Sequence, residues 1–183
     1  SRAYNESFNT RFRGALEVDA LRAALHDVIG RHDALRTTFS ADGQFQKVAP
    51  ALAIEIPLLD WSQASPDERQ TRITAIPAEE ANQAFDLVNG PLVRSRILKL
   101  ESDDHLLVFT AHHLVFDGWS SNVILNELSA LYSAKREEKT AALPPPASYG
   151  EYVRLEAEAQ QSPEWRAAEA WWRDLFATPV PRL

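Results

Sequence analysis

Residues 111–120 read Ala-His-His-Leu-Val-Phe-Asp-Gly-Trp-Ser, and the rest of the sequence is organised around them. This signature stretch follows the apolar run at 106–109 and precedes a segment whose apolar residues recur at helical spacing. The order predicts a strand, a tight loop and a helix, an arrangement that exposes side chains where the strand ends. Apolar residues occupy both alternating faces of the run, which is typical of a central strand covered on both sides.

The two histidines and the aspartate are the chemically capable side chains of the signature stretch. A neutral imidazole accepts a proton near pH 7, because its unperturbed pKa is about 6.5. Neighbouring side chains of a strand point to opposite faces, so we expect His113 to face a cavity and His112 to face the protein body in a structural role. Asp117 is suited to orienting an imidazole, pairing with an arginine or capping the next helix. Gly118 permits a sharp backbone bend.

The composition is that of a globular protein, with 183 residues of which 45% are hydrophobic and 25% charged. The formal net charge of −7 makes nucleic acid a poor partner. Neither a membrane span nor a signal peptide is predicted, so a cytoplasmic location is expected. No metal site is predicted either, because the chain has no cysteine and adjacent strand histidines cannot easily aim at one ion. The chain contains no methionine, which indicates a fragment of something larger.

Strand-like and helix-like segments are mixed along the chain, which predicts an α/β (α+β) fold. Strands are expected at 4–13, 45–48, 53–59, 93–100 and 105–112, and helices at 19–30, from 65, after the signature stretch, from 148 and from 162. Asp19 is the expected N-cap of the first helix. Ser65 and Glu68 form a capping box for the second, and Pro77 is expected to kink or split that helix.

The last expected helix carries a stripe of aromatic residues. Trp165, Trp172 and Phe176 recur at helical spacing on one face. An aromatic stripe of this kind is typical of ordinary core, and we predict that it is buried.

The pattern HHxxxDG at 112–118 resembles the signature of nonribosomal peptide synthetase condensation domains, which belong to the chloramphenicol-acetyltransferase-like acyltransferases. Two further segments resemble motifs of the same family in the same order. They are RHxxLRTxF at 31–39 and FDLxxGPLxR at 85–94. The resemblance extends from about residue 4 to the end of the chain, and it implies a chloramphenicol-acetyltransferase-like sandwich in which a mixed sheet carries flanking helices.

The resemblance also implies an organisation and a reaction. The chain, 1–183, would be the N-terminal lobe of a two-lobed condensation domain whose C-terminal lobe is absent, and the lone lobe is expected to be inactive. An acyl or peptidyl thioester on the phosphopantetheine of an upstream carrier domain would be attacked by the amine of a downstream aminoacyl thioester, giving an amide. The expected partners are both carrier domains and the C-terminal lobe, and no cofactor is expected to bind directly.

The resemblance assigns roles to individual residues. His113 would act as general base or as the group that positions the amine, and the N–H of Gly118 would help to stabilise an oxyanion. Arg36, with Arg31 as the less favoured choice, would pair with Asp117. Phe116 is bulkier than is usual before the aspartate, so it is expected to narrow the site or to change which donor is accepted.

Three alternative functions remain. An epimerisation domain shares the histidines and the aspartate but usually has Val-Ser-Trp-Arg after the glycine, where this chain has Trp-Ser-Ser-Asn at 119–122. A catalytically silent lobe would serve as a docking surface for carrier or tailoring proteins, although an intact His113 and Asp117 count against it. A free-standing acyltransferase would use coenzyme A or an alcohol acceptor.

Overall fold

The computed structural model describes residues 4–177, which form two compact units divided after Pro146. The helices and strands of the first unit are β1 (Asn5–Arg13), α1 (Val18–Arg31), the 3₁₀ helix η2 (Asp33–Arg36), β2 (Thr37–Phe39), β3 (Gln46–Val48), β4 (Leu58–Asp60), α2 (Pro66–Asn82), β5 (Val93–Glu101), β6 (Asp104–His112) and α3 (Gly118–Arg136). The second unit holds α4 (Tyr149–Ala159) and α5 (Pro163–Leu175). In this described part of the chain, no helix combines the length and apolarity that crossing a membrane requires.

The first unit is built on a four-stranded sheet in the order β1-β6-β5-β4. β1, β6 and β5 pair antiparallel, whereas the short β4 pairs parallel with β5. Strands β2 and β3 form a separate antiparallel pair. The predicted mixed sheet is therefore present, although the strand expected at 53–59 is reduced to β4.

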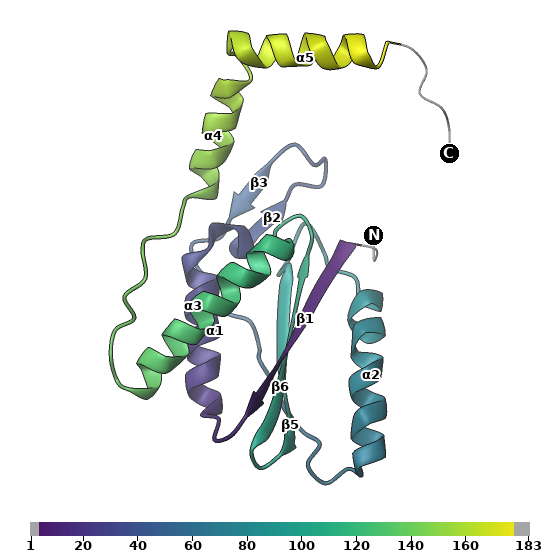
Figure 1. Ribbon diagram of the computed structural model, residues 1–183, viewed down its shortest axis with the longest axis vertical. Coiled ribbons are helices and arrows are strands. Elements are labelled where there is room, and N and C mark those ends of the chain that lie inside the picture. Colours follow the sequence, from purple (N-terminus) through teal and green to yellow (C-terminus); the bar gives the residue numbers. More distant parts are fainter. Residues whose placement is uncertain (1–3, 178–183) are drawn as a thin grey trace. The chain divides into compact units, whose positions relative to one another are not determined.

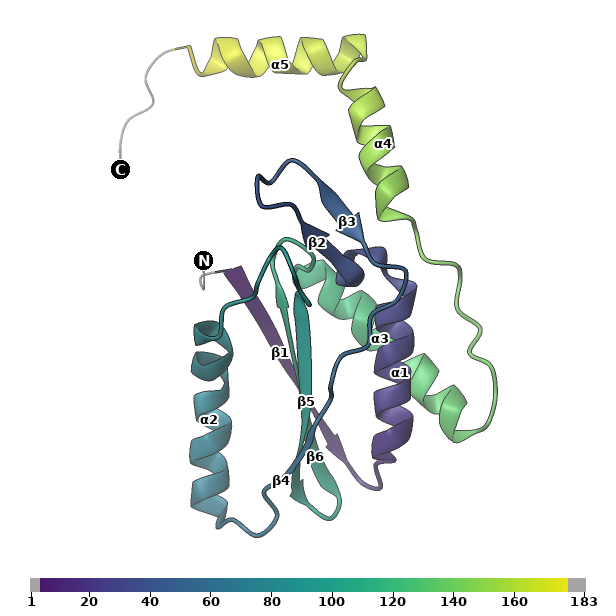
Figure 2. The same cartoon turned by 180° about the vertical axis from the view of Figure 1, so that it is seen from behind.

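Helices cover both faces of this sheet, with α1 and α3 on one side and α2 on the other (Figures 1 and 2). Leu107 and Phe109 of β6 belong to the core beneath α1 and α3. Leu106 and Val108, the alternate residues of the same strand, pack with Ile76 of α2. β6 is thus the doubly covered central strand that the alternating apolar run predicts.

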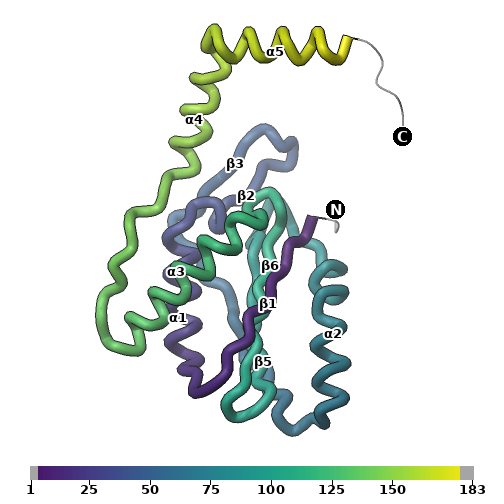
Figure 3. The backbone as a smooth tube through the Cα atoms, viewed as in Figure 1, coloured from purple at the N-terminus to yellow at the C-terminus, as the bar shows by residue number. Residues whose placement is uncertain are grey.

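β1, the first strand along the chain, pairs with β6, the last strand along the chain. Along β1 and β6 the register runs from Asn5 opposite His112 to Arg13 opposite Asp104, and Figure 3 shows the two segments side by side. The start of β1 therefore lies against the end of β6, which is where the signature stretch begins.

Local signals explain most helix starts. Ser65 and Glu68 form the predicted capping box of α2, which runs on past Pro77 without being split. The first helix begins earlier than expected. Glu17 occupies the N-cap of α1, and Asp19 lies in its first turn, where a carboxylate suits the helix dipole.

The aromatic stripe of α5 is exposed, so the prediction that it is core is wrong for the described residues. Trp165, Trp172 and Phe176 are 43%, 53% and 55% exposed. Trp172 stacks on Phe176 with ring centroids 5.7 Å apart, and Trp171 meets Trp172 edge-on at 4.7 Å. These side chains therefore contact one another along the helix while their outer faces stay open.

Candidate active site

A tight turn carries the second histidine out of the sheet. β6 ends at His112, so His113 is the first residue beyond the strand rather than its last member. The N–H of His113 donates to the carbonyl of Tyr4 over 2.8 Å, and the N–H of Val115 donates to the carbonyl of His112 over 2.9 Å. These two bonds hold the backbone of the turn while the side chain of His113 points away from the core.

The His113 imidazole has a defined tautomer and an open side. Its Nδ1 lies 2.9 Å from the carbonyl oxygen of Phe116. A carbonyl oxygen only accepts, so the proton is on Nδ1 and the lone pair is on Nε2. The side chain is 45% exposed. Nε2 is thus available to accept a proton or a hydrogen bond from an incoming group.

His112 is buried and neutral. Its Nδ1 accepts the N–H of Leu114 over 3.2 Å, and its ring lies edge-on to Phe85 with centroids 6.3 Å apart. Burial lowers the pKa of His112 below its ordinary value. His112 is therefore buried, as a structural role would require, although it also lines a cavity together with His113.

Asp117 caps helix α3, one of the three roles open to it from the sequence. Its carboxylate accepts the N–H of Ser120 over 2.8 Å and the Ser120 hydroxyl over 2.6 Å, while the Asp117 N–H donates back to that hydroxyl. The Ser120 hydroxyl, helped by the Ser120 N–H, holds the pKa of the Asp117 carboxyl below its usual range. This reciprocal cap fixes the end of the turn that carries His113.

The expected pairing of Asp117 with Arg36 is wrong. The Arg36 guanidinium instead donates to Asp33 over 2.7 Å and to the carbonyl of Ala49. Arg31, the less favoured choice, pairs with Glu127 of α3 over 2.9 Å. Arg36 pairs with Asp33, three residues before it, because the turn of η2 brings the two side chains together without any tertiary contact.

His32, beside Arg31, contacts the same carboxylate. Its Nε2 lies 2.9 Å from Glu127. The RHxxLRTxF segment therefore ties the end of α1 to the middle of α3, and it braces the helix that follows the signature stretch.

Replacing Asp117 by alanine is expected to destabilise the protein by about 1 kcal/mol at pH 7, because the cap of α3 is lost. Asp117→Asn is the matched control, since asparagine caps a helix about as well. Because the folded pKa of Asp117 is lowered, its contribution is fully present above the pKa of an unfolded aspartate, about 3.9. It disappears as pH falls through the folded pKa. Urea unfolding at several pH values should show that the free energies of unfolding of the alanine variant and the wild type converge in acid. A difference between them that stays constant with pH would contradict this.

Gly118 is the first residue of α3. Its φ lies outside the left-handed region, and a Cβ built there would meet no atom of the chain within 4 Å. The fold itself thus accepts a side chain at this position. The open space beside Gly118, at the N-terminus of α3, leaves its backbone accessible.

Two cavities flank the signature stretch. One, of about 340 Å³, is lined by Tyr4, Leu87, His112, His113 and Leu114. The sequence did not single out Tyr4 or Leu87 as site residues, but Leu87 belongs to the FDLxxGPLxR segment, and that motif was the available signal. Among the described residues, no group of three or more His, Asp or Glu side chains is placed to hold a metal ion.

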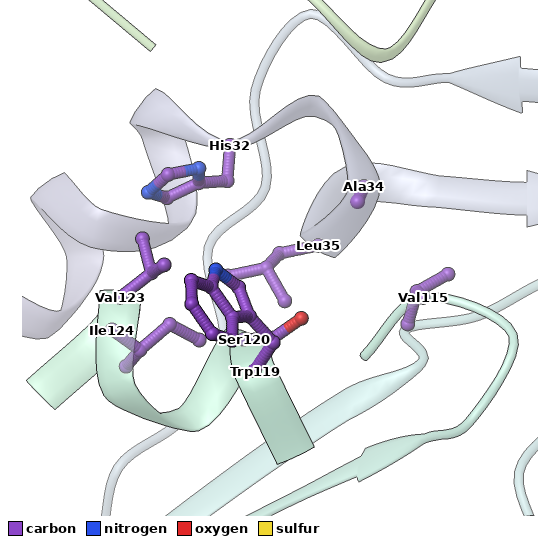
Figure 4. Close-up of a pocket in the computed structure, with 8 residues that line it drawn as sticks. All are labelled: His32, Ala34, Leu35, Val115, Trp119, Ser120, Val123 and Ile124. Atoms are coloured by element: carbon purple, nitrogen blue, oxygen red, sulfur yellow. The ribbon is translucent and has the colours of Figure 1, made fainter. Parts of the chain in front are cut away.

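The second cavity, of about 190 Å³, lies between the end of α1, η2 and the first turns of α3 (Figure 4). His32, Leu35 and Trp119 are among its lining residues, and Trp119 is 79% exposed. Phe116 lines neither cavity. It is buried against Phe8 and Phe109, with ring centroids 6.0 and 5.6 Å away, so the expectation that its bulk narrows the site is wrong for the cavities of this chain.

Comparison with known proteins shows the family of the chain. A family model described as "Condensation domain" matches residues 1–183. A linear gramicidin synthase of Brevibacillus parabrevis is 33% identical over 183 residues, which cover 98% of this chain and 2% of that protein.

Solved structures give the same result for the fold. The starter condensation domain of the rhizomide synthetase RzmA is 28% identical with a TM-score of 0.87, and the match covers 98% of this chain and 44% of that one. The X-domain complex with OxyB from teicoplanin biosynthesis is also 28% identical, with a TM-score of 0.81 and coverages of 98% and 39%. These likenesses confirm the predicted α/β fold class. The chain spans less than half the length of each of these three proteins.

Proposed function

This chain belongs to the condensation-domain family, and we propose that it is the N-terminal lobe of a two-lobed domain that forms amide bonds in nonribosomal peptide synthesis. The observation that carries the proposal is the state of His113. Its imidazole stands at the mouth of a cavity, with Nδ1–H donated to the Phe116 carbonyl and Nε2 open. A C-terminal lobe would close the other side of that cavity.

The proposed reaction joins two thioesters carried on phosphopantetheine. The amine nitrogen of the downstream aminoacyl group attacks the carbonyl carbon of the upstream acyl or peptidyl group. The C–N bond forms, the C–S bond breaks, and the upstream carrier leaves as a thiol. The amine loses one proton in this step, and the thiolate gains one, so proton transfer balances without an external reagent.

His113 would serve this reaction in one of two ways. As general base, its Nε2 takes the proton from the attacking nitrogen and returns it to the departing sulfur. As a positioning group, Nε2 accepts a hydrogen bond from the neutral amine and aims its lone pair at the carbonyl carbon. The tautomer inferred from the contact of Nδ1 with the Phe116 carbonyl suits both roles, since each needs an unprotonated Nε2.

A direct test uses the protein that carries both lobes. It is given an acyl thioester on one carrier domain and an aminoacyl thioester on another, and the downstream carrier is analysed by mass spectrometry. An amide-linked product on that carrier is the expected result. Hydrolysis alone would contradict the proposal, and a donor whose α-carbon is inverted without transfer would favour the epimerisation alternative.

A docking function is the second candidate, and one observation favours it. The X-domain structure to which this chain is similar is a complex with another protein, OxyB. The function of a silent docking lobe would not depend on the tautomer or the exposure of His113. The two candidates therefore separate on whether the wild-type two-lobed protein forms the amide and loses that activity when His113 is substituted.

Gly118→Ala tests whether substrate approaches the backbone at the start of α3. The variant is expected to keep its stability within about 0.5 kcal/mol, because the added methyl group meets nothing in the chain. Condensation should slow by roughly ten-fold or more if the Gly118 N–H lies against the oxyanion, since a methyl group would obstruct that contact. Thermal unfolding and the initial rate are the two measurements. Ser121→Ala, one turn into α3, is the control, and equal rates in both variants would contradict the backbone role.

A further inference from the structure

A carboxylate that the proposed reaction has not used lies next to the catalytic candidate. Glu6 is on β1, opposite Ala111 of β6. Its Oε1 is 3.6 Å from Nδ1 of His113, and the two side chains are 46% and 45% exposed. Because Nδ1–H is donated to the Phe116 carbonyl, the carboxylate stands on the protonated side of the ring, away from Nε2.

The two residues just before Glu6 are anchored by hydrogen bonds. Before it, the Nδ2 of Asn5 donates to the carbonyls of Glu80 and Gln83 at the end of α2, over 2.9 and 2.8 Å. The carbonyl of Tyr4 accepts the N–H of His113. Glu6 and His113 are therefore held in register by the pairing of β1 with the turn, and their proximity follows from the fold and not from two free surface side chains meeting by chance.

Other titratable groups around His113 are committed elsewhere or carry no negative charge. Asp117 uses its carboxylate to cap α3. His112 is neutral and accepts the Leu114 N–H. Tyr4 lines the cavity with its phenol ring, a neutral group near pH 7. His113 also helps to lower the pKa of Asp117, so two carboxylates lie near the imidazole, and Glu6 is the one that does not cap a helix.

We propose that Glu6 is a positioning residue for the condensation reaction, holding His113 in the Nδ1–H tautomer and stabilising the imidazolium that forms when Nε2 takes the amine proton. This inference rests on the proposed function and on the general-base role within it. In the step, the proton moves from the attacking nitrogen to Nε2, and Glu6 neither gives nor takes a proton. The contact is a long ionic one beside solvent, so its effect should be moderate and should weaken as salt is added.

Glu6→Gln removes the charge and keeps the shape. In the two-lobed protein it is expected to lower kcat roughly three- to ten-fold, with KM for either thioester changed by less than about two-fold. The acidic limb of the pH–rate profile should move to lower pH by about 0.5 unit, because the protonated ring is no longer stabilised. Glu79→Gln is the matched control, since Glu79 is a similarly exposed carboxylate, 55%, paired with Arg96 on the α2 side of the sheet. It should behave as wild type.

A readout that needs no turnover separates the inference from the proposed function. Nitrogen NMR of the labelled imidazole of His113 reports its tautomer and the midpoint of its titration in the chain alone. Glu6→Gln should displace that midpoint to lower pH relative to Glu79→Gln. If the midpoint moves but the wild-type protein makes no amide, the contact stands and the proposed function fails. If the wild type makes amide and Glu6→Gln matches Glu79→Gln in midpoint, kcat and pH profile, the role of Glu6 is overturned while the proposed function survives.

Discussion

His113→Ala is expected to abolish most condensation activity, lowering kcat by about 10²-fold or more, because no other described residue lining the cavity offers an unprotonated ring nitrogen to the attacking amine. His112, the other imidazole there, is buried, and its Nδ1 is already bonded to the Leu114 N–H. Stability should change little, since the His113 side chain is 45% exposed and belongs to neither core cluster of the described residues. Product formation by mass spectrometry and urea unfolding are the measurements.

His26→Ala is the control for loss of an imidazole. His26 lies on α1 with its Nε2 2.9 Å from the carbonyl of Ile54, and it lines neither of the cavities beside the signature stretch. The control should condense at the wild-type rate. A His113→Ala variant that also condenses normally would contradict both the base and the positioning role of His113, while amide formation itself would stand.

Phe109→Ala is expected to destabilise the first unit by about 3–5 kcal/mol, the largest stability effect we predict. Phe109 is fully buried at 0% exposure, and its ring centroid is 5.1 Å from that of Phe8 and 5.6 Å from that of Phe116. Truncation leaves a cavity between β1, β6 and the turn, and the neighbouring rings cannot close it without moving the backbone. The free energy of unfolding in urea measures the loss.

The same substitution should disturb the site, because the Phe116 carbonyl that orients His113 belongs to a residue packed against Phe109. Phe109→Leu is the matched control. It keeps most of the volume and should cost only about 1 kcal/mol. If the alanine and leucine variants lost equally little free energy of unfolding, the rings of Phe8 and Phe116 would have to relax into the cavity, contrary to the close packing described for them.

Signals that act over a few residues were read correctly from the sequence. The capping box of Ser65 and Glu68 is completed within one helical turn, so no tertiary information is needed to predict it. Capping by Asp117 is equally local, but the sequence left it open beside two other roles. The alternation of Leu106, Leu107 and their neighbours likewise predicted a strand covered on both sides, since burial on two faces leaves its mark on every residue of the run.

Interactions between distant segments were predicted less well. Arg36 and Arg31 were both plausible partners for Asp117. Asp33 was a local competitor for Arg36, three residues before it, whereas nothing in the sequence pointed from Arg31 to the distant Glu127. The contact of Glu6 with His113 joins residues more than a hundred positions apart, and only the β1–β6 register brings them together. The apolar character of a helix face does not identify the residues that pack on it. The aromatic stripe of α5 was therefore predicted to be buried, whereas it is exposed among the described residues.

The pairing of β1 with β6 has a consequence for how the polypeptide is made. Asn5 leaves the ribosome 107 residues before its partner His112, which at usual elongation rates is a delay of roughly 5 to 20 s. During that interval Phe8 and Phe12 have no strand to pair with, and the nascent segment is open to chaperones or to wrong partners. The turn that carries His113 can form only after residues 104–112 of β6 have been synthesised, so slow translation of that segment would delay the pairing of β1 with β6.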